Sequence, residues 1–249
     1  MADILANTYS IVGRCSRTGE MGAAVASAVP AVGAICLYLR PGIGAVSTQS
    51  WVNPYLADTI LDRMAGGLPA MAAVTAAMQD DPAAHVRQIG AIGHNGPGSA
   101  FTGSDCTPWC GQQSGEDYAV QGNMLTGPEV IEAMASAFCA SFDDPLDHRL
   151  LQALVAAQAA GGDKRGRQSA ALQVVGAEAY ARVDLRVDEH ADPVTELARV
   201  HRVAELQLAP FVAGMPRRGE VAAPAPAAVT EMLLRSPPKR PGGGGSSQP

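Results

Sequence analysis

The chain has 249 residues, of which 47% are hydrophobic and only 4% aromatic, and its formal net charge is −6. This length suits one large domain or two small ones, with a core built from small aliphatic side chains. The charged residues are scattered, which argues against a basic nucleic-acid surface and a basic membrane-binding helix. The first ten residues lack the positive and apolar segments of a secretory signal. We therefore expect a cytoplasmic protein with no nucleic-acid or membrane partner.

The first fifty residues indicate strands separated by turns. Strands are predicted at 8–14 and 21–27, joined by a connection that contains the Thr-Gly of a hairpin turn. Two more strands are predicted at 33–39 and 44–50, because short apolar runs without strict alternation are typical of strands covered on both faces.

Pairs of helices then alternate with strands. Asn53 followed by Pro54 is a strong helix start, so helices are predicted at 53–64 and, after two glycines, at 67–80. The later predicted elements, in chain order, are strands within 86–104 and at 118–125, helices within 126–142 and 144–162, a strand pair within 169–190 and a helix from 192. This order favours an α+β fold over repeated βαβ units.

The composition changes near Met215 to proline, alanine and arginine, and the chain ends in a Gly- and Ser-rich segment. A segment of this kind buries too little apolar surface to order itself. We expect a single domain over 8–214, an N-terminal extension over 1–7 and a flexible tail over 215–249.

Cysteine and histidine spacing gives little support for a metal site. The five cysteines have no framework spacing and are expected to be reduced thiols, although Cys106 and Cys110 are close enough for a disulfide or half a metal site. The five histidines are dispersed and form no HxxxH or HxH pair, so we expect them at the surface. The sequence predicts no metal and no other cofactor.

Seven sequence blocks occur in a fixed order along the chain: TYSIVGR, TGEMGAAVAS, VGAICLYLRPGIGAVSTQSWVNP, AFTGSDC, VQGNML, GGDKRGRQSAALQVV and RVDLRVDEHADPVTEL. Together they resemble a known bacterial family, domain of unknown function family 1028, over roughly residues 8–205. The resemblance implies membership of the N-terminal nucleophile (Ntn) hydrolases, with a four-layer αββα sandwich of two mainly antiparallel sheets between helical layers. It implies no particular substrate.

The resemblance makes Thr8 the candidate nucleophile. A threonine hydroxyl needs a base, and a free α-amine on the same residue, with a pKa near 8, can accept its proton. Family members typically begin Met-Thr, whereas seven residues precede Thr8 here. Three alternatives stay open: the true start lies further in, the chain cuts itself between Asn7 and Thr8, or no free amine forms and Thr8 is simply a strand residue.

Further site candidates are polar residues near strand ends. Asn123 could donate to a developing oxyanion, or form an Asx turn or cap the next helix. The substrate-binding candidates are Ser27, Gln49, Thr102, Arg165 and Gln168. For most of these the alternative is ordinary turn or loop chemistry, and for Arg165 it is an ion pair with Asp184 or Asp188.

The leading hypothesis is therefore an Ntn-type amidohydrolase that cleaves a small amide, imide, ureido or peptide-like C–N bond. The alternative is a non-catalytic binding or assembly module on the same fold, and a hydrolase that uses Cys15 or Ser27 as nucleophile is a third reading. The alanine-rich helices and acidic balance are compatible with a homo-oligomer.

Overall fold

The computed structural model describes residues 8–235. The expected N-terminal extension over 1–7 and the last part of the expected tail, 236–249, lie outside the described residues. The chain divides into two compact units after His201, and each is described by itself.

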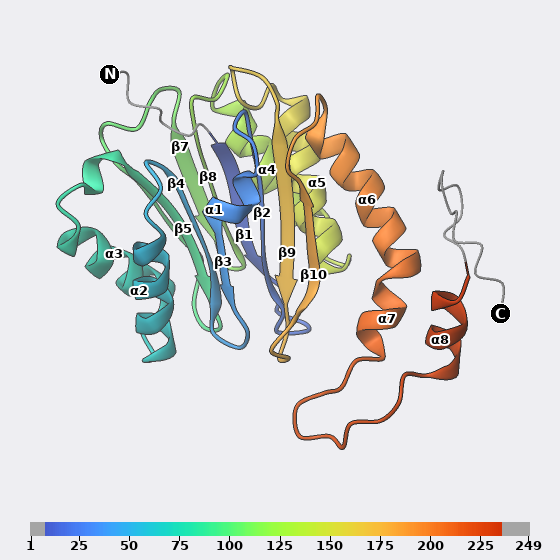
Figure 1. The fold of residues 1–249 in the computed structure, drawn as a ribbon. Helices are drawn as coiled ribbons and strands as arrows, with labels where there is room; N and C mark the ends of the chain where they lie inside the picture. Colours follow the sequence, from blue (N-terminus) through green and yellow to red (C-terminus); the bar gives the residue numbers. More distant parts are fainter. Residues whose placement is uncertain (1–7, 236–249) are drawn as a thin grey trace. The chain divides into compact units, whose positions relative to one another are not determined.

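The first unit contains a six-stranded sheet in which every neighbouring pair is antiparallel. Its order is β10-β9-β2-β1-β8-β7, so the first two strands of the chain lie at its centre (Figure 1). The strands are β1 (Thr8–Arg14), β2 (Met21–Ser27), β7 (Gly111–Gly115), β8 (Tyr118–Asn123), β9 (Ser169–Val175) and β10 (Ala181–Val187).

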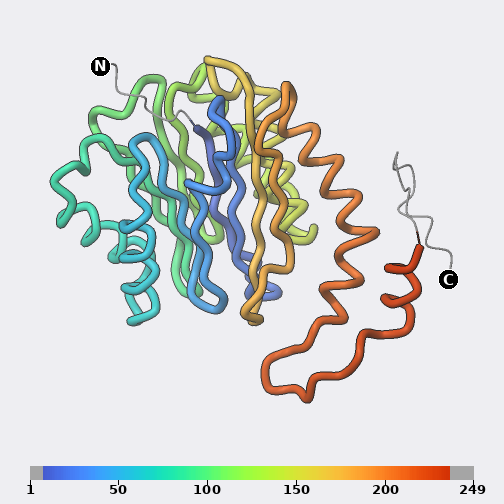
Figure 2. The backbone as a smooth tube through the Cα atoms, viewed as in Figure 1, coloured from blue at the N-terminus to red at the C-terminus, as the bar shows by residue number. Residues whose placement is uncertain are grey.

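A second, four-stranded sheet has the order β3-β4-β5-β6 and is also antiparallel throughout. Its hairpin connections can be followed along the backbone in Figure 2. The strands are β3 (Leu37–Arg40), β4 (Gly44–Ser50), β5 (Arg87–Gly93) and β6 (Ser99–Thr102). The two sheets contact each other through β1, β4 and β5, and apolar side chains such as Val12, Ala45 and Ile92 fill the interface.

One pair of helices packs on each sheet (Figure 1). The pair α2 (Pro54–Ala65) and α3 (Ala70–Asp80) contacts β4 and β5, and its buried stripe includes Ile60 and Val74. The pair α4 (Glu129–Ala140) and α5 (Leu146–Ala159) contacts β8, β1 and β2. The predicted α+β class with two antiparallel sheets is confirmed.

Several predicted elements match closely because their signals are local. β1 and β2 have the predicted bounds, and α2 begins where Asn53 accepts a hydrogen bond from the backbone N–H of Tyr55. The predicted second helix begins three residues later than expected, at Ala70.

The predicted strand at 33–39 is wrong. The short helix α1 (Val32–Cys36) occupies most of it, and β3 starts only at Leu37. Ala31, with a left-handed φ of 51°, redirects the chain into this helix. Val32 and Cys36 are both buried and lie four residues apart, which is the spacing of one helix face. The apolar run therefore fits a helix turn as well as a strand. Strand β7 was also not predicted, because its sequence, GQQSG, is polar and glycine-rich.

Four further elements complete the described chain. They are a 3₁₀ turn at Ala84–Val86 in the first unit, α6 (Pro193–Gln207), which crosses the division, and α7 (Ala209–Ala213) and α8 (Ala227–Leu233) in the second unit. In the described part of the chain, no helix combines the length and the apolar character needed to cross a membrane.

Candidate active site

Three predicted site residues meet at one end of the six-stranded sheet. Thr8, the first residue of β1, is paired in register with Ser27 of β2 on one side and Asn123 of β8 on the other. Thr8 Oγ1 donates to Ser27 Oγ across 3.2 Å. All three residues are buried, with Thr8 and Asn123 at 0% exposure. Antiparallel pairing thus gathers residues that lie more than a hundred positions apart in the sequence.

Gln49 reaches this group from the opposite sheet. Its Nε2 donates to the backbone carbonyl of Thr8 at 3.1 Å and to Gln88 Oε1 at 2.8 Å. Gln88 Oε1 also accepts from Asn123 Nδ2 at 2.9 Å, and Gln88 Nε2 donates to Thr102 Oγ1 at 3.0 Å. Five of the predicted residues are therefore members of one hydrogen-bonded group, which is centred on Gln88.

Sequence reasoning missed Gln88 and a deeper polar layer between the sheets. Ser10 Oγ donates to Gln49 Oε1 at 2.6 Å, lies 2.9 Å from Ser47 Oγ and accepts from Gln121 Nε2 at 2.6 Å. All of these side chains have 0% exposure. The available signal was a polar residue inside an otherwise buried apolar strand, which needs a hydrogen-bond partner.

Two side-chain amide oxygens in this polar region accept no hydrogen bond from the described part of the chain. Within residues 8–235, Gln121 Oε1 and Asn123 Oδ1 are buried and have no hydrogen-bond partner. A buried, unpaired polar atom is costly and often marks a place where a ligand or water binds.

The loop that carries Arg165 and Gln168 lies beside Ser27. Asp163 accepts hydrogen bonds from the backbone N–H groups of Ala28 and Arg165, and the backbone N–H of Gln168 donates to the Ser27 carbonyl at 2.9 Å. The Asp163 side chain is only 1% exposed.

The arginines of this loop pair with carboxylates near it. Arg165 Nη2 lies 3.1 Å from Asp163 Oδ2, and Arg167 Nη1 lies 3.5 Å from Asp192 Oδ1. Asp184, one of the alternative partners considered for Arg165, pairs with Arg186 of its own strand.

The Thr8 hydroxyl bonds the Ser27 hydroxyl, and the Thr8 carbonyl bonds the Gln49 amide; neither of these two side chains titrates near neutral pH. The adjacent phenol of Tyr9 does not supply a base either, because burial raises its pKa above the ordinary range and keeps it protonated.

Three cavities are lined by described residues, and none of the three is lined by a predicted site residue. The largest of them, about 500 Å³, lies beside α3 and β6 and is lined by Met71, Val74, Phe101 and Ser114, among others. The predicted residues form a packed polar interface rather than the wall of any of these three cavities.

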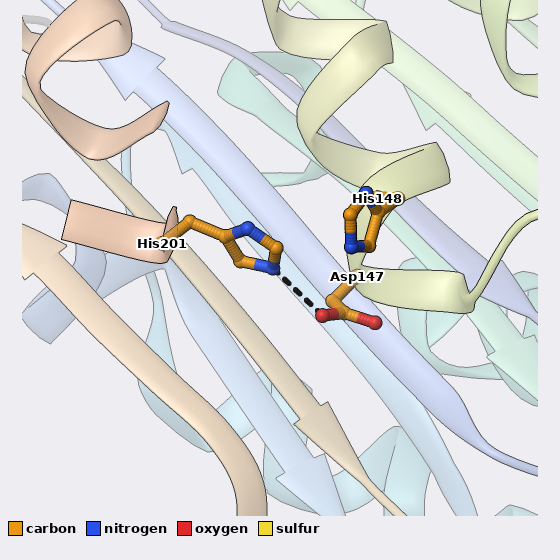
Figure 3. Close-up of side chains that lie close together, drawn as sticks. All are labelled: Asp147, His148 and His201. Atoms are coloured by element: carbon orange, nitrogen blue, oxygen red, sulfur yellow. Dashed lines mark hydrogen bonds and ion pairs between the residues drawn. The ribbon is translucent and has the colours of Figure 1, made fainter. Parts of the chain in front are cut away.

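A second polar cluster comes from α5 and α6. Asp147 Oδ2 lies 2.7 Å from His201 Nε2, and the ring of His148 lies edge-on to the ring of His201 (Figure 3). Burial alone would raise the pKa of Asp147, but hydrogen bonds from His201 and Arg182 hold it well below its ordinary range. His201 is 2% exposed, so the expectation of surface histidines is wrong for this residue. Tertiary packing joins two histidines that lie far apart in the sequence.

The close cysteine pair forms no disulfide. Cys106 and Cys110 are both free thiols, and Cys110 Sγ donates to the backbone carbonyl of Cys106 at 3.4 Å.

Comparison with known proteins identifies one family. Residues 8–197 match DUF1028, described as a family of unknown function. A crystal structure of protein SPO2555 from Silicibacter pomeroyi, assigned to the same family, is 30% identical, with a TM-score of 0.78, and the match covers 85% of this chain and 95% of that one. Anbu (ancestral beta-subunit) from Yersinia bercovieri matches at 13% identity and a TM-score of 0.36 over 84% of this chain and 98% of that one. No curated protein matches the chain.

Proposed function

The chain belongs to the DUF1028 family, and from this premise we propose that it is an Ntn-type amidohydrolase that uses Thr8 to cleave a small amide, imide, ureido or peptide-like C–N bond. The observation that carries the proposal is the meeting of Thr8, Ser27 and Asn123 at one end of the central strands. The packing of one helix pair on each of two contacting sheets supports the αββα layering that such enzymes use.

The proposed base is the α-amine of Thr8. An amine on the same residue lies close enough to take the hydroxyl proton, whereas the Ser27 hydroxyl that bonds Thr8 Oγ1 is not a base at neutral pH. In the chain as given, that nitrogen is bonded to Asn7. The proposal therefore requires a form of the protein that begins at Thr8.

In the first half of the reaction, Thr8 Oγ1 bonds to the substrate carbonyl carbon while the amine takes the hydroxyl proton. The C–N bond then breaks, the leaving nitrogen receives that proton, and an acyl ester remains on Thr8. In the second half, the amine deprotonates a water molecule, which attacks the ester, and Thr8 Oγ1 recovers its proton as the acid leaves. These steps use no cofactor.

The other candidates take supporting roles in this proposal. The Asn123 amide nitrogen carries two hydrogens, of which Gln88 accepts one, so the second can stabilise the oxyanion. Gln49 holds the Thr8 carbonyl and thereby the position of the nucleophile. Ser27 contacts the Thr8 hydroxyl. Thr102, Arg165 and Gln168 are proposed to contact the substrate.

The test uses two forms of the protein and a β-lactone, which acylates an activated hydroxyl and adds its own mass. One form is the chain as given, and the other begins at Thr8 after removal of a fusion partner. We expect intact-mass measurement to show one added lactone on the Thr8-start form, at Thr8. Labelling should be lost in Thr8→Ala and kept in the matched control Thr126→Ala, whose threonine is exposed. Equal labelling of Thr8→Ala and the unsubstituted Thr8-start form would contradict the proposal.

One observation favours a second candidate function, a non-catalytic binding or assembly module. Thr8 is completely buried, and its nitrogen lies in a peptide bond in the chain as given. A purified protein that keeps residues 1–7, together with a Thr8-start form that takes up no lactone, would support this module.

A further inference from the structure

Asp147, His148 and His201 bring three metal-ligand atoms close together. The first two residues open α5 and the third lies on α6, and one ligand atom from each can be chosen so that all lie within 4.8 Å of one another. Figure 3 shows the Asp147 carboxylate and both imidazole rings grouped between the two helices. The ring centroids of the two histidines are 4.8 Å apart, and the rings are nearly perpendicular.

The two oxygens of Asp147 have different partners. Oδ1 accepts from Arg182 Nη2 at 2.8 Å, while Oδ2 lies 2.7 Å from His201 Nε2. Arg182 is itself paired with Glu20, which balances its charge. One oxygen is therefore held by a second residue, as is common for carboxylates that bind metals, and the other faces the imidazoles.

We propose that Asp147, His148 and His201 form a binding site for a divalent transition-metal ion of the Zn²⁺ type. Two imidazoles and one carboxylate are the donors that Zn²⁺ accepts, whereas Mg²⁺ and Ca²⁺ prefer oxygen donors alone. The ion replaces the hydrogen bond between Asp147 Oδ2 and His201 Nε2, and water fills the fourth position.

The geometry requires only a small adjustment. Ligand atoms about 2.0–2.2 Å from a tetrahedral ion lie about 3.3 Å apart. The 2.7 Å contact between Asp147 and His201 would open slightly, and the atoms now as far as 4.8 Å apart would close. Rotation of the half-buried His148 ring, the least enclosed of the three side chains, supplies most of that closure.

The bound ion would connect the start of α5 to His201 of α6, both within the first unit. A clamp between two helices stabilises the folded state in proportion to metal concentration, because the unfolded chain lacks the assembled site. This role is independent of the chemistry proposed for Thr8.

The experiment uses the full chain, stripped of metal with a chelator and titrated with Co²⁺, whose visible absorption reports tetrahedral binding, and then with Zn²⁺ by calorimetry. We expect one equivalent of each ion to bind and Zn²⁺ to raise the melting temperature. His148→Ala should weaken binding at least tenfold and abolish the thermal shift. The matched control is His94→Ala, which removes an exposed histidine far from α5 in the sequence.

Two further results decide the proposal. Thr8→Ala should bind metal as the unsubstituted chain does, so loss of hydrolase labelling and loss of metal binding are separate outcomes. The proposal is overturned if circular dichroism shows that His148→Ala is folded and it binds Co²⁺ with unchanged affinity and spectrum. It is also overturned if the unsubstituted chain binds no ion, since the cluster is then only a hydrogen-bonded contact between α5 and α6.

Discussion

Ser10 on the six-stranded sheet donates a hydrogen bond to Gln49 on the four-stranded sheet, with 2.6 Å between Ser10 Oγ and Gln49 Oε1. This contact crosses an interface that also contains apolar side chains such as Val12, Ala45 and Ile92. A polar layer buried at such an interface fixes how the sheets align only if its members stay paired. The stability of this layer can be measured without knowledge of any substrate.

Replacing Gln49 tests the layer directly. Gln49→Leu removes the hydrogen bonds to Ser10, Gln88 and the Thr8 carbonyl and leaves these buried groups unsatisfied. We expect the free energy of unfolding, measured by urea denaturation, to fall by about 3 kcal/mol. Gln79→Leu, on the exposed side of α3, should change it by no more than about 0.5 kcal/mol. Similar values for the two variants would show that the layer contributes little.

Gly90 is needed because Gln121 occupies the space beside it. A Cβ at Gly90 would overlap the Gln121 side-chain amide, which is itself fully buried and has no room to swing aside. Gly90→Ala should lower the unfolding free energy by about 1–3 kcal/mol. Gly176→Ala is the matched control, since its added carbon would meet only Glu20 Cγ, at 4.0 Å. An unchanged urea midpoint for Gly90→Ala would mean that β5, which carries Gly90, and β8, which carries Gln121, move apart without cost to accept the added carbon.

The Asp81–Arg87 pair predicts a pH dependence of stability. The two side chains are each 8% exposed, and Asp81 Oδ2 lies 2.8 Å from Arg87 Nε. Burial alone raises the pKa of Asp81, but hydrogen bonds from Arg87 and from the backbone N–H of Ala83 lower it below the ordinary value. The folded state therefore favours the carboxylate, so this contribution is present above about pH 4 and is lost as the pH falls through the folded-state pKa.

Asp81→Asn should lower the unfolding free energy at pH 7 by about 1–3 kcal/mol, and the gap from the unsubstituted chain should narrow below about pH 4. Urea denaturation at several pH values measures both effects. The matched control is Asp80→Asn, which breaks the ion pair between Asp80 and Arg63. The Asp80 side chain is 72% exposed, so this substitution should lower the unfolding free energy by less than about 1 kcal/mol. A gap for Asp81→Asn that stays constant from pH 7 to pH 3 would contradict the assigned ionisation.

Thiol reactivity should separate Cys36 from Cys139. Cys36 is fully buried in α1, and burial raises its pKa to about 12, whereas Cys139 on α4 is exposed. Because the thiolate is the reactive form, iodoacetamide should modify Cys139 at least about a hundredfold faster in the native protein. Peptide mass mapping over time measures both rates, and urea-unfolded protein serves as the control in which they converge. Equal native rates would place Cys36 within reach of solvent.

Elements with strong local signals were predictable from the sequence. The Asn53–Pro54 pattern predicted both ends of α2 to within one residue, and the turn between β1 and β2 predicted the bounds of both strands. The run at 33–39 was not predictable in this way, because a buried helix turn and a buried strand share the same apolar composition.

The candidate site was predictable only as a set of unconnected residues. Family resemblance selected Thr8, and polar strand ends selected Asn123, Ser27 and Gln49, but no sequence spacing indicated that they touch. Gln88, which bonds both Gln49 and Asn123, was not selected, since a glutamine inside a strand has no local signal of its partners.

By itself, the sequence determined the α+β class and most of the helices and strands, since these follow from period, turn residues and composition along neighbouring positions. The choice of Thr8 as candidate nucleophile came from the family resemblance. Only the tertiary structure decided that Thr8 lies between Ser27 and Asn123 and that His148 and His201 meet at Asp147. The physical reason is that these contacts depend on antiparallel register and helix packing between segments far apart in the chain, where side-chain volume and hydrogen-bond pairing, rather than local propensity, select the arrangement.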